Sequence, residues 1–389
     1  MLSFCIFRVF YVFGGDILAN FKYSKLADWL RGEIEGGTFS AGSKIPTEVE
    51  LSNRFSASRQ TVRQALALLE KENYLFKVQG SGTFVKKRVI SNNPLPIHIS
   101  SGNSKTINVI MNDPGNYIFT NVLRGIHDAL HEHGYTMNLN ISSTHVFQER
   151  QSLECILKNG SNGLIIEPAR TGLPLLNRSL FQEISERIPC VFIHASFAEL
   201  NIPSVTVDNF SIFAKLTKLL IDKGHTKIAA FCKCDEQTSI ERYQGYAEEM
   251  MKNGLEFNEK YTTWYTYDTF PFLFTDKNAT NVLNRIKDCT AVLCHNDLLA
   301  GSFIQFLTRH GISVPNDISV VGIDDYLDYS PAIPLTTAIH PKEKLGRTAV
   351  EILMKRISGE SQDLNCTFDM EIVERASVRD FTKRSSYHF

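Results

Sequence analysis

The chain has 389 residues, enough for two or three domains, and 43% of them are hydrophobic, so a sizeable core can be buried. The net charge of −1 by itself argues neither for nor against a nucleic-acid partner, but the charge is unevenly distributed. Residues 22–88 carry 12 basic and 7 acidic residues, whereas residues 89–389 carry 28 and 34. This asymmetry indicates that only the first region contacts a polyanion.

Residues 1–21 are predicted to be an extension outside the fold. The first 13, MLSFCIFRVFYVF, are apolar but too short to span a bilayer. They lack the basic start and the small-residue cleavage site of a signal peptide. No later segment is long and apolar enough for a membrane span, so we expect a cytoplasmic protein without membrane contact.

Residues 22–72 show the pattern of a helix–turn–helix. A first helix carries apolar residues at 26, 29, 30 and 34 and ends at Gly36-Gly37. Thr47 and Glu50 form a capping box at the start of a short second helix. Ser58 caps a third helix that runs to about residue 72, with Arg and Gln crowding its first turns. Side chains that read bases are expected there, because a recognition helix enters the major groove by its N-terminus.

Two short β-like runs follow, over residues 74–79 and 83–87, around Gly80-Ser81-Gly82. A β-hairpin after a recognition helix is a wing, whose glycines let the main chain approach the DNA closely. Lysines and an arginine on this hairpin would add phosphate contacts: Lys77, Lys86, Lys87 and Arg88.

Residues 22–88 therefore resemble the winged helix–turn–helix domain of the GntR family. The matching motifs are the Pro-Thr-Glu start at residue 46, the Ser-Arg-x-Thr-Val-Arg helix at residue 58 and the Gly-Ser-Gly-Thr-Phe-Val wing at residue 80. The resemblance implies contacts to double-stranded operator DNA from one set of residues: Thr47, Glu48, Ser58, Arg59, Gln60, Thr61, Arg63, Gly80, Ser81 and Gly82.

Residues 89–105 are polar, contain two prolines and have no periodicity, which is typical of a linker. From residue 106 to about residue 380, short apolar runs alternate with amphipathic helices, and residues 381–389 form a tail. This alternation predicts an α/β fold with parallel sheets covered on both faces. It occurs twice, so we expect two similar lobes with chain crossings near residues 207 and 336.

Ligands of open α/β sheets bind at the carboxyl ends of the strands. The residues that follow the predicted strands are rich in Asp, Asn, His, Glu and aromatic types: 112–119, Glu167, His194 with Ser196, Asn296 with Asp297, and Asp324 with Asp325. This mixture suits a sugar, which needs paired acceptors for its hydroxyls and an aromatic face for its C–H surface. Alternatively, such residues are helix caps or turns, and for Asn296 this interpretation is at least as good.

Residues 105–380 resemble the LacI/GalR effector domain, which is similar to type I periplasmic sugar-binding proteins. The segment from Ala291 to Asp325 carries the strongest match, and an Arg-x-x-Gly-Tyr motif begins at Arg242. The resemblance implies a two-lobed body in which a set of residues contacts the effector: Tyr117, Phe119, Glu167, His194, Arg242, Asn296, Asp324 and His340.

A GntR-like head on such a body resembles the family of arabinose-utilisation repressors, which implies L-arabinose as the effector. We therefore expect a sugar-responsive repressor that binds operator DNA as a homodimer and releases it when sugar binds. Regulation by another pentose or by a sugar phosphate is an alternative, as is a sugar-binding protein without a regulatory role. The basic head argues against the last.

An enzyme is the remaining alternative, because two α/β lobes also occur in dehydrogenases and kinases. No Gly-x-Gly-x-x-Gly follows the strand at 106–111 and no phosphate-binding loop motif occurs, so we expect no catalytic activity and no cofactor. The eight cysteines are scattered through apolar runs and resemble reduced core thiols. Cys232 and Cys234 have no second ligand pair nearby, so we expect a strand end there and no metal site.

Overall fold

The computed structural model describes residues 26–27, 29–30, 33–34, 38–39, 42–55, 57–71, 74–78, 82–86, 105–112, 117–326, 333–360 and 364–382. It divides the chain into two compact units, residues 1–100 and 101–389, which we treat separately. The predicted extension, the wing residues Gly80 and Ser81 and most of the predicted linker lie outside the described residues.

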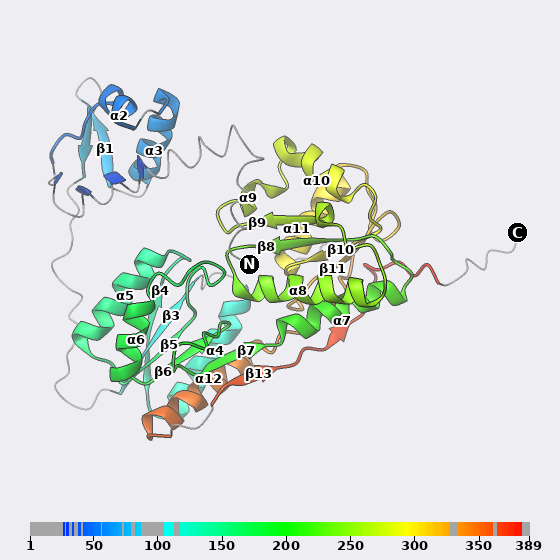
Figure 1. Ribbon diagram of the computed structural model, residues 1–389. Coiled ribbons are helices and arrows are strands. Elements are labelled where there is room, and N and C mark those ends of the chain that lie inside the picture. Colours follow the sequence, from blue (N-terminus) through cyan, green and yellow to red (C-terminus); the bar gives the residue numbers. More distant parts are fainter. Residues whose placement is uncertain are drawn as a thin grey trace, which may run out of the picture. The chain divides into compact units, whose positions relative to one another are not determined.

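The first unit contains the predicted helix–turn–helix and wing (Figure 1). Helix α2 spans Glu48–Phe55 and α3 spans Arg59–Lys71, and strands β1 (Leu75–Val78) and β2 (Gly82–Val85) pair antiparallel. The sequence did not predict that residues 43–45 lie beside β2. Ile45 N donates to Thr83 O at 3.0 Å, and Val85 N donates to Ser43 O at 2.9 Å. The wing is thus a hairpin extended by a third short segment.

Local capping starts both helices, as predicted. Glu50 Oε2 accepts from Thr47 N at 2.7 Å and Glu50 N donates to Thr47 Oγ1 at 3.3 Å, which is the reciprocal capping box. Thr61 N donates to the Ser58 hydroxyl at 3.1 Å at the start of α3. The apolar faces of these helices then bury a small common core: Leu26, Leu30, Leu51, Val62, Leu66, Leu69 and Val85.

The second unit is the predicted α/β body with two parallel sheets, so the predicted fold class is confirmed (Figure 1). The first lobe has a six-stranded sheet in the order β13-β7-β6-β5-β3-β4. Its strands are β3 (Thr106–Met111), β4 (Thr136–Ile141), β5 (Gly163–Ile166), β6 (Cys190–Ile193), β7 (Ser204–Val207) and β13 (Cys366–Phe368).

Helices cover both faces of this sheet: α4 (Tyr117–Glu132), α5 (Val146–Asn159), α6 (Arg178–Arg187) and α12 (Lys342–Ile357). Alternate strand residues face opposite layers, as the two-residue period of a strand requires. Val109 and Ile165 belong to the cluster that contains residues of α4 and α12. Ile110 and Ile166 belong to the cluster that contains residues of α5 and α6.

The second lobe has a four-stranded sheet in the order β11-β10-β8-β9. Its strands are β8 (Ile228–Lys233), β9 (Thr262–Tyr265), β10 (Ala291–Cys294) and β11 (Ser319–Val321). Its helices are α7 (Asn209–Asp222), α8 (Gln237–Lys252), α9 (Phe270–Leu273), α10 (Ala279–Ile286) and α11 (Asp297–Arg309), with single 3-10 turns at Glu259–Tyr261 and Asp276–Asn278. Cys232 is buried in β8, in agreement with the strand predicted there.

The chain crosses between the lobes three times. The first crossing follows β7, and the second runs from β12 (Thr337–Ala338) into α12, close to the positions predicted. The sequence did not predict the third, in which the chain leaves β13 and forms β14 (Ile372–Val373), which pairs with β12. The third crossing is bonded to the first, because Asp208 N donates to Phe368 O at 2.8 Å.

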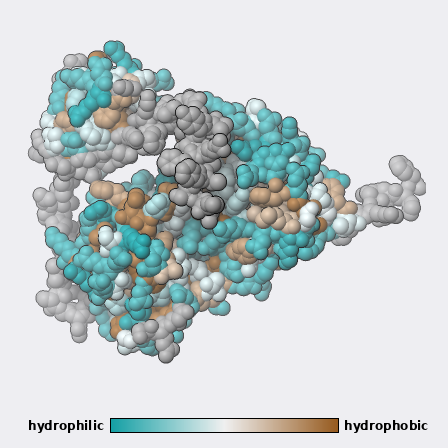
Figure 2. Space-filling view, in the orientation of Figure 1, coloured by the Kyte–Doolittle hydropathy of each residue, from teal (hydrophilic) through white to brown (hydrophobic). Residues whose placement is uncertain are grey.

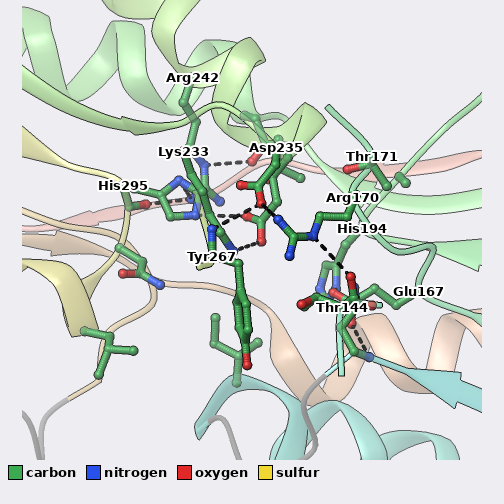
Figure 3. Close-up of a pocket in the computed structure, with 18 of the residues that line it drawn as sticks. Thr144, Glu167, Arg170, Thr171, His194, Lys233, Asp235, Arg242, Tyr267 and His295 are labelled. Carbon is green, nitrogen blue, oxygen red and sulfur yellow. Dashed lines mark hydrogen bonds and ion pairs between the residues drawn. The ribbon is translucent and has the colours of Figure 1, made fainter. Parts of the chain in front are cut away.

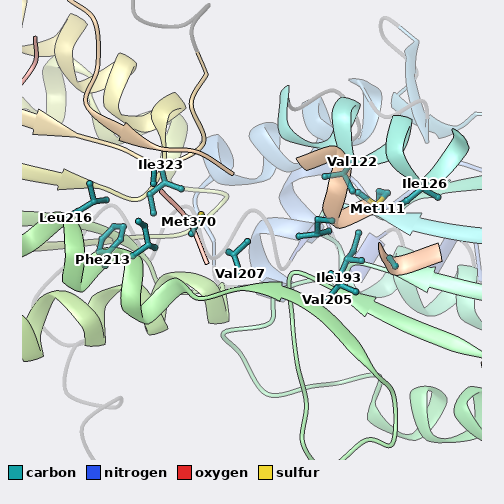
Figure 4. Packing of buried hydrophobic residues seen from close by; sticks show 14 of the residues in the cluster. Met111, Val122, Ile126, Ile193, Val205, Val207, Phe213, Leu216, Ile323 and Met370 are labelled. Carbon is teal, nitrogen blue, oxygen red and sulfur yellow. The ribbon is translucent and has the colours of Figure 1, made fainter. Parts of the chain in front are cut away.

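One hydrophobic cluster runs through these crossings from lobe to lobe (Figure 4). Val122 and Ile193 lie in the first lobe, Phe213 and Leu216 lie in the second, and Val207 with Met370 joins the two groups. The lobes are therefore attached by shared apolar packing as well as by the chain. No helix in the described ranges is long and apolar enough to cross a membrane.

Helices α4 and α12 approach one another closely because each has a glycine at the contact. A Cβ added at Gly125 of α4 would lie 2.1 Å from the carbonyl oxygen of Glu343 in α12, and one added at Gly346 would lie 2.2 Å from the carbonyl oxygen of Val122. Real side chains do not approach a backbone atom so closely, so any side chain here forces the helices apart.

We expect Gly125→Ala to destabilise the protein by about 1–3 kcal/mol, the usual cost of overpacking a close contact. Urea unfolding followed by circular dichroism measures the change. Thr120→Ala, on the exposed side of the same helix, is the matched control and should stay within about 0.5 kcal/mol of wild type. Equal stability of the two variants would contradict the close packing of α4 on α12.

Candidate functional site: an interlobe cavity and a DNA-binding head

A cavity of about 370 Å³ lies between the two lobes of the body (Figure 3). Its walls come from the carboxyl ends of strands in both sheets, as expected for parallel α/β sheets. Seven of the residues predicted to contact an effector line it: Phe119, Glu167, His194, Arg242, Asn296, Asp324 and His340. The body thus brings together side chains that are up to about 220 positions apart in the sequence.

Four individually predicted residues are not among the described residues that line the cavity: Tyr117, Ser196, Asp297 and Asp325. Asp297 is buried and accepts from Thr337 Oγ1 at 2.7 Å, and Asp325 is paired with Arg375 at 2.6 Å. Ser196 has an exposed side chain, and its backbone N–H donates to the Gln237 side chain at 3.4 Å. Tyr117 begins α4, but its side chain lies outside the described residues. The Asn296 side chain caps α11 by accepting from Leu299 N at 3.0 Å, which is the alternative that the sequence left open. Asn296 also lines the cavity, and its contact with an effector stays a prediction.

The loops at the cavity are locally strained. Six non-glycine residues of the described chain have left-handed φ angles, and all six follow a strand at its carboxyl end: Ser143, Thr144, Arg170, His194, Asp324 and Asp325. Four of them line the cavity. Such conformations cost energy and persist where the surrounding structure enforces them, which is common at binding sites. The cavity wall is therefore fixed by the fold.

Histidines and a glutamate form the wall on the side of the first lobe. His194 Nδ1 lies 3.3 Å from Glu167 Oε1, and Glu167 Oε2 accepts from Asn112 N at 3.1 Å. Two buried ring nitrogens, His194 Nε2 and His340 Nδ1, have no hydrogen-bond partner in the described structure. Burial holds the pKa of His340 well below its usual range, so this imidazole is neutral at neutral pH. These nitrogens are suited to hydroxyl groups of a ligand.

A network of charges forms the wall on the side of the second lobe. The Lys233 ammonium is bonded to Glu236, and Glu236 Oε2 lies 3.2 Å from His295 Nε2. Burial would raise the pKa of the Glu236 carboxyl, but Lys233 and His295 lower it, so it is ionised. Burial lowers the pKa of His295 to about 4. Arg242 donates to the His295 carbonyl at 2.7 Å and, through Nε, to Asn209 at 3.0 Å.

Sequence reasoning missed several residues of this wall. Lys233 ends β8, and Asp235 and Glu236 follow it closely, so the rule that selected His194 would have selected them. Tyr265 and Tyr267 end and follow β9, a strand that was not predicted. These tyrosines, with Phe119 and Phe270, give the cavity an aromatic surface beside its charges: all four line it.

A buried carboxyl group behind the cavity fixes the loop that follows β5. Glu149 of α5 is 1% exposed, and its two oxygens accept from Ala169 N at 2.6 Å and from Asn177 Nδ2 at 2.7 Å. Burial raises the pKa of Glu149 from 4.5 to about 7. The carboxyl therefore anchors the start of the loop that carries Arg170 into the cavity wall.

In the head, the predicted DNA-contacting residues fall into distinct environments. Arg59 and Gln60 are exposed in the first turn of α3. Arg63 Nε pairs with Glu48 Oε2 at 2.8 Å and thereby joins α3 to α2. Thr61 is 5% exposed and bonded to the Ser58 hydroxyl, so it stabilises the start of the helix, and the DNA contact predicted for it stays a prediction.

Of the four cations predicted to contact phosphates from the wing, Lys77 and Lys86 belong to the described residues, and Lys87 and Arg88 lie outside them. Lys77 Nζ lies 3.2 Å from Glu70 Oε1, and both side chains are partly exposed. Gly82 has a φ of +123°, in the region that favours glycine, at the start of β2. Thr47 is held in place by its capping-box bonds to Glu50. Glu48, the first residue of α2, is held by its bond to Arg63 of α3.

Comparison with known proteins matches both units. The model of bacterial regulatory proteins of the gntR family matches residues 22–85, and the periplasmic binding protein-like domain model matches residues 217–378. The arabinose metabolism transcriptional repressor of Geobacillus stearothermophilus is 33% identical over 368 residues, which are 92% of this chain and 98% of that protein. The chain, whose N-terminal region matches the gntR family model, belongs to this family of transcriptional repressors.

A second member of the family, the arabinose metabolism transcriptional repressor of Halalkalibacterium halodurans, is 30% identical over 90% of this chain and 93% of its own length. The crystal structure of the transcription regulator CcpA of Lactococcus lactis has a TM-score of 0.63, is 24% identical and covers 71% of this chain and 100% of its own, which shows a common fold. The protein is thus a sugar-responsive transcriptional repressor of the LacI/GntR type and no enzyme.

We expect Arg59→Ala to weaken operator binding by about 1–3 kcal/mol and to relax base preference, because an exposed arginine at the start of a recognition helix can fork onto a guanine. Fluorescence anisotropy with operator and random DNA measures both. Arg150→Ala, an exposed arginine of α5 in the body, should change neither. Equal losses on the two DNAs would show a phosphate contact, and wild-type binding would exclude Arg59 from the interface.

We expect Glu149→Gln to become relatively more stable than wild type as the pH rises. The folded-state pKa of about 7 lies above the unfolded value of 4.5, so stability from the protonated group is present below pH 4.5 and is lost by about pH 7. Between pH 5 and pH 8 the unfolding free energy of wild type should fall by up to about 3 kcal/mol relative to that of the variant. Glu154→Gln, exposed on the same helix, should show no such shift, and parallel profiles for Glu149→Gln and wild type would contradict the raised pKa.

Proposed function

We propose that the protein is a repressor that releases its operator when L-arabinose binds in the interlobe cavity. The observation that carries the proposal is the similarity along nearly the whole chain to two arabinose metabolism repressors, at 33% and 30% identity. The cavity supports the proposal independently of these two relatives, because its polar and aromatic lining suits a small polyhydroxylated ligand. Such a repressor works where the DNA is, so we place it in the cytoplasm.

Two of the three cations among the described residues of the cavity wall are already paired with carboxylates, which favours a neutral sugar over a sugar phosphate. Lys233 is paired with Glu236, and Arg170 is paired with Asp235 at 2.6 Å. A phosphate group needs cations that are not already neutralised by carboxylates. Arg242 is buried and donates to neutral acceptors, so it is the cation best placed to bond sugar hydroxyls in our proposal.

We propose that operator DNA is bound by a homodimer, because one small head reads only half of a two-fold operator. Joining two heads raises the effective concentration of the second head at its half-site. The edge of the first lobe is a candidate surface for the pairing of two bodies. Strand β4 lies at that edge, Leu139, Ile141 and Phe147 are exposed there, and hydrophobic residues gather over this part of the lobe (Figure 2).

We expect calorimetry to show saturable binding of L-arabinose to the full chain and little heat with D-ribose, D-xylose or a sugar phosphate. Arg242→Ala should abolish the heat and leave operator binding without sugar intact, because the guanidinium lines the effector cavity of the body. Arg178→Ala, an exposed arginine of α6, is the control and should bind sugar normally.

Two results would contradict parts of this proposal. Saturable heat of binding with another sugar and none with L-arabinose would show that the effector is that other sugar. The assignment of the protein as a repressor would be unaffected. If Arg242→Ala lowers the melting temperature and operator affinity together, then Arg242 is a structural residue and does not report on the sugar site.

A further inference from the structure

A loop of the first lobe is bonded to a loop of the second lobe at the cavity. The loop after β5 contributes Arg170, Thr171 and Gly172, and the loop after β8 contributes Asp235 together with Gln237, the first residue of α8. Gly172 N donates to the Asp235 carbonyl at 3.2 Å, and Gln237 N donates to the Thr171 hydroxyl at 2.9 Å. These bonds join the lobes on the cavity side, away from the chain crossings.

Arg170 is the charged part of this contact (Figure 3). One guanidinium nitrogen lies 2.6 Å from Asp235 Oδ2, and the other lies 2.8 Å from Asp268 Oδ2. The Asp235 side chain is 1% exposed, whereas the Asp268 side chain is 65% exposed. Asp235 Oδ2 also accepts from Tyr267 N at 3.1 Å. Opening the lobes would separate Arg170 from Asp235 and break the two hydrogen bonds that join the loops.

Gly172 determines how closely the loops approach. A Cβ added there would lie 2.7 Å from Cys234 O, 2.7 Å from Glu236 N and 2.9 Å from the Asp235 carbonyl carbon. All three atoms are backbone atoms of the other lobe, so they cannot rotate away. The φ of Gly172 is outside the left-handed region, so alanine fits the conformation of its own loop. A side chain at this position clashes only when the lobes are closed.

The first-lobe half of the contact is held rigidly by its own lobe. Glu149 accepts from Ala169 N, and Arg170 Nε donates to the Thr144 carbonyl at 3.2 Å. The loop therefore cannot follow the second lobe when the lobes separate. The contact has to form or break as a unit with cleft closure.

We propose that Arg170, Thr171 and Gly172 form an interlobe latch with Asp235 and Gln237 that sets how readily the body closes over its effector. Gly172 does not line the cavity, so it acts as a positioning residue through closure alone. The proposal rests on the proposed function for the identity of the sugar. If the effector binds the closed form, a change that lowers the population of the closed form lowers the apparent affinity for the effector by the same factor.

The test compares Gly172→Ala with Leu173→Ala, an exposed neighbour in the same loop, in the full chain. We expect Gly172→Ala to weaken L-arabinose binding about 10-fold, within the ~5–150-fold range of such couplings, with faster dissociation of the sugar. Operator binding without sugar should stay at the wild-type level or become tighter. Leu173→Ala should behave as wild type, and Arg170→Lys, which keeps the charge and loses the planar fork, should be intermediate.

Two outcomes would overturn the latch. The first is L-arabinose binding by Gly172→Ala within twofold of wild type. The second is a joint loss of sugar binding, operator binding and melting temperature, which would show that Gly172 is needed for folding rather than for closure.

Hydrogen exchange without any sugar separates the latch from the proposed effector. The amides of Gly172 and Gln237 donate across the lobes, so they should be protected in wild type and in Leu173→Ala and should exchange faster in Gly172→Ala. If wild type binds no L-arabinose, the proposed effector is wrong, and this exchange difference still decides the latch. Equal exchange in all three proteins would overturn it.

Discussion

The body depends on the shared apolar packing at its chain crossings. Val207, Met370 and their neighbours belong to one hydrophobic cluster that continues into both lobes, and the first and third crossings are hydrogen-bonded to each other. Such packing resists sliding, because close-packed interiors have few ways to rearrange. The lobes therefore have one fixed end, and their remaining freedom is to rotate about it and change the separation of the cavity walls.

This fixed end explains why the polar chemistry of the body collects where it does. Both sheets are parallel, so their carboxyl ends meet at the cavity, and the strained loops that follow the strands supply its lining. Charged groups in this position lose water when the lobes close, and each is paired or hydrogen-bonded: Lys233 with Glu236, Arg170 with Asp235, and Arg242 with Asn209. A neutral ligand with many hydroxyls completes such a surface without adding charge.

Local features could be predicted from the sequence because their causes are local. The capping box of Thr47 and Glu50 and the cap at Ser58 involve residues three positions apart, so the sequence displays them directly. The strand-end rule selected Glu167, His194, Asn296 and Asp324, which line the cavity, because each follows a short apolar run that predicts a strand. It also applies to Lys233 and Asp235, at the end of the strand predicted beside Cys232, although these two were not among the predicted site residues.

Long-range features were not predictable in this way. The pairing of β13 with β7 joins residues about 160 positions apart, and no local pattern marks it. The burial of Thr61 follows from packing within the head, although its place in the motif had indicated a DNA contact. Arg170 and Gly172 gave no signal in the sequence, because their importance comes from the opposite lobe.

The central claim is that sugar in the cavity and operator at the head oppose each other. The most direct measurement determines operator affinity with and without saturating L-arabinose, and L-arabinose affinity with and without saturating operator, on the same protein. The account predicts that both affinities fall by one common factor, of the order of ~5–150-fold, because coupling between two sites is reciprocal. Saturable L-arabinose binding that leaves operator affinity unchanged would contradict it.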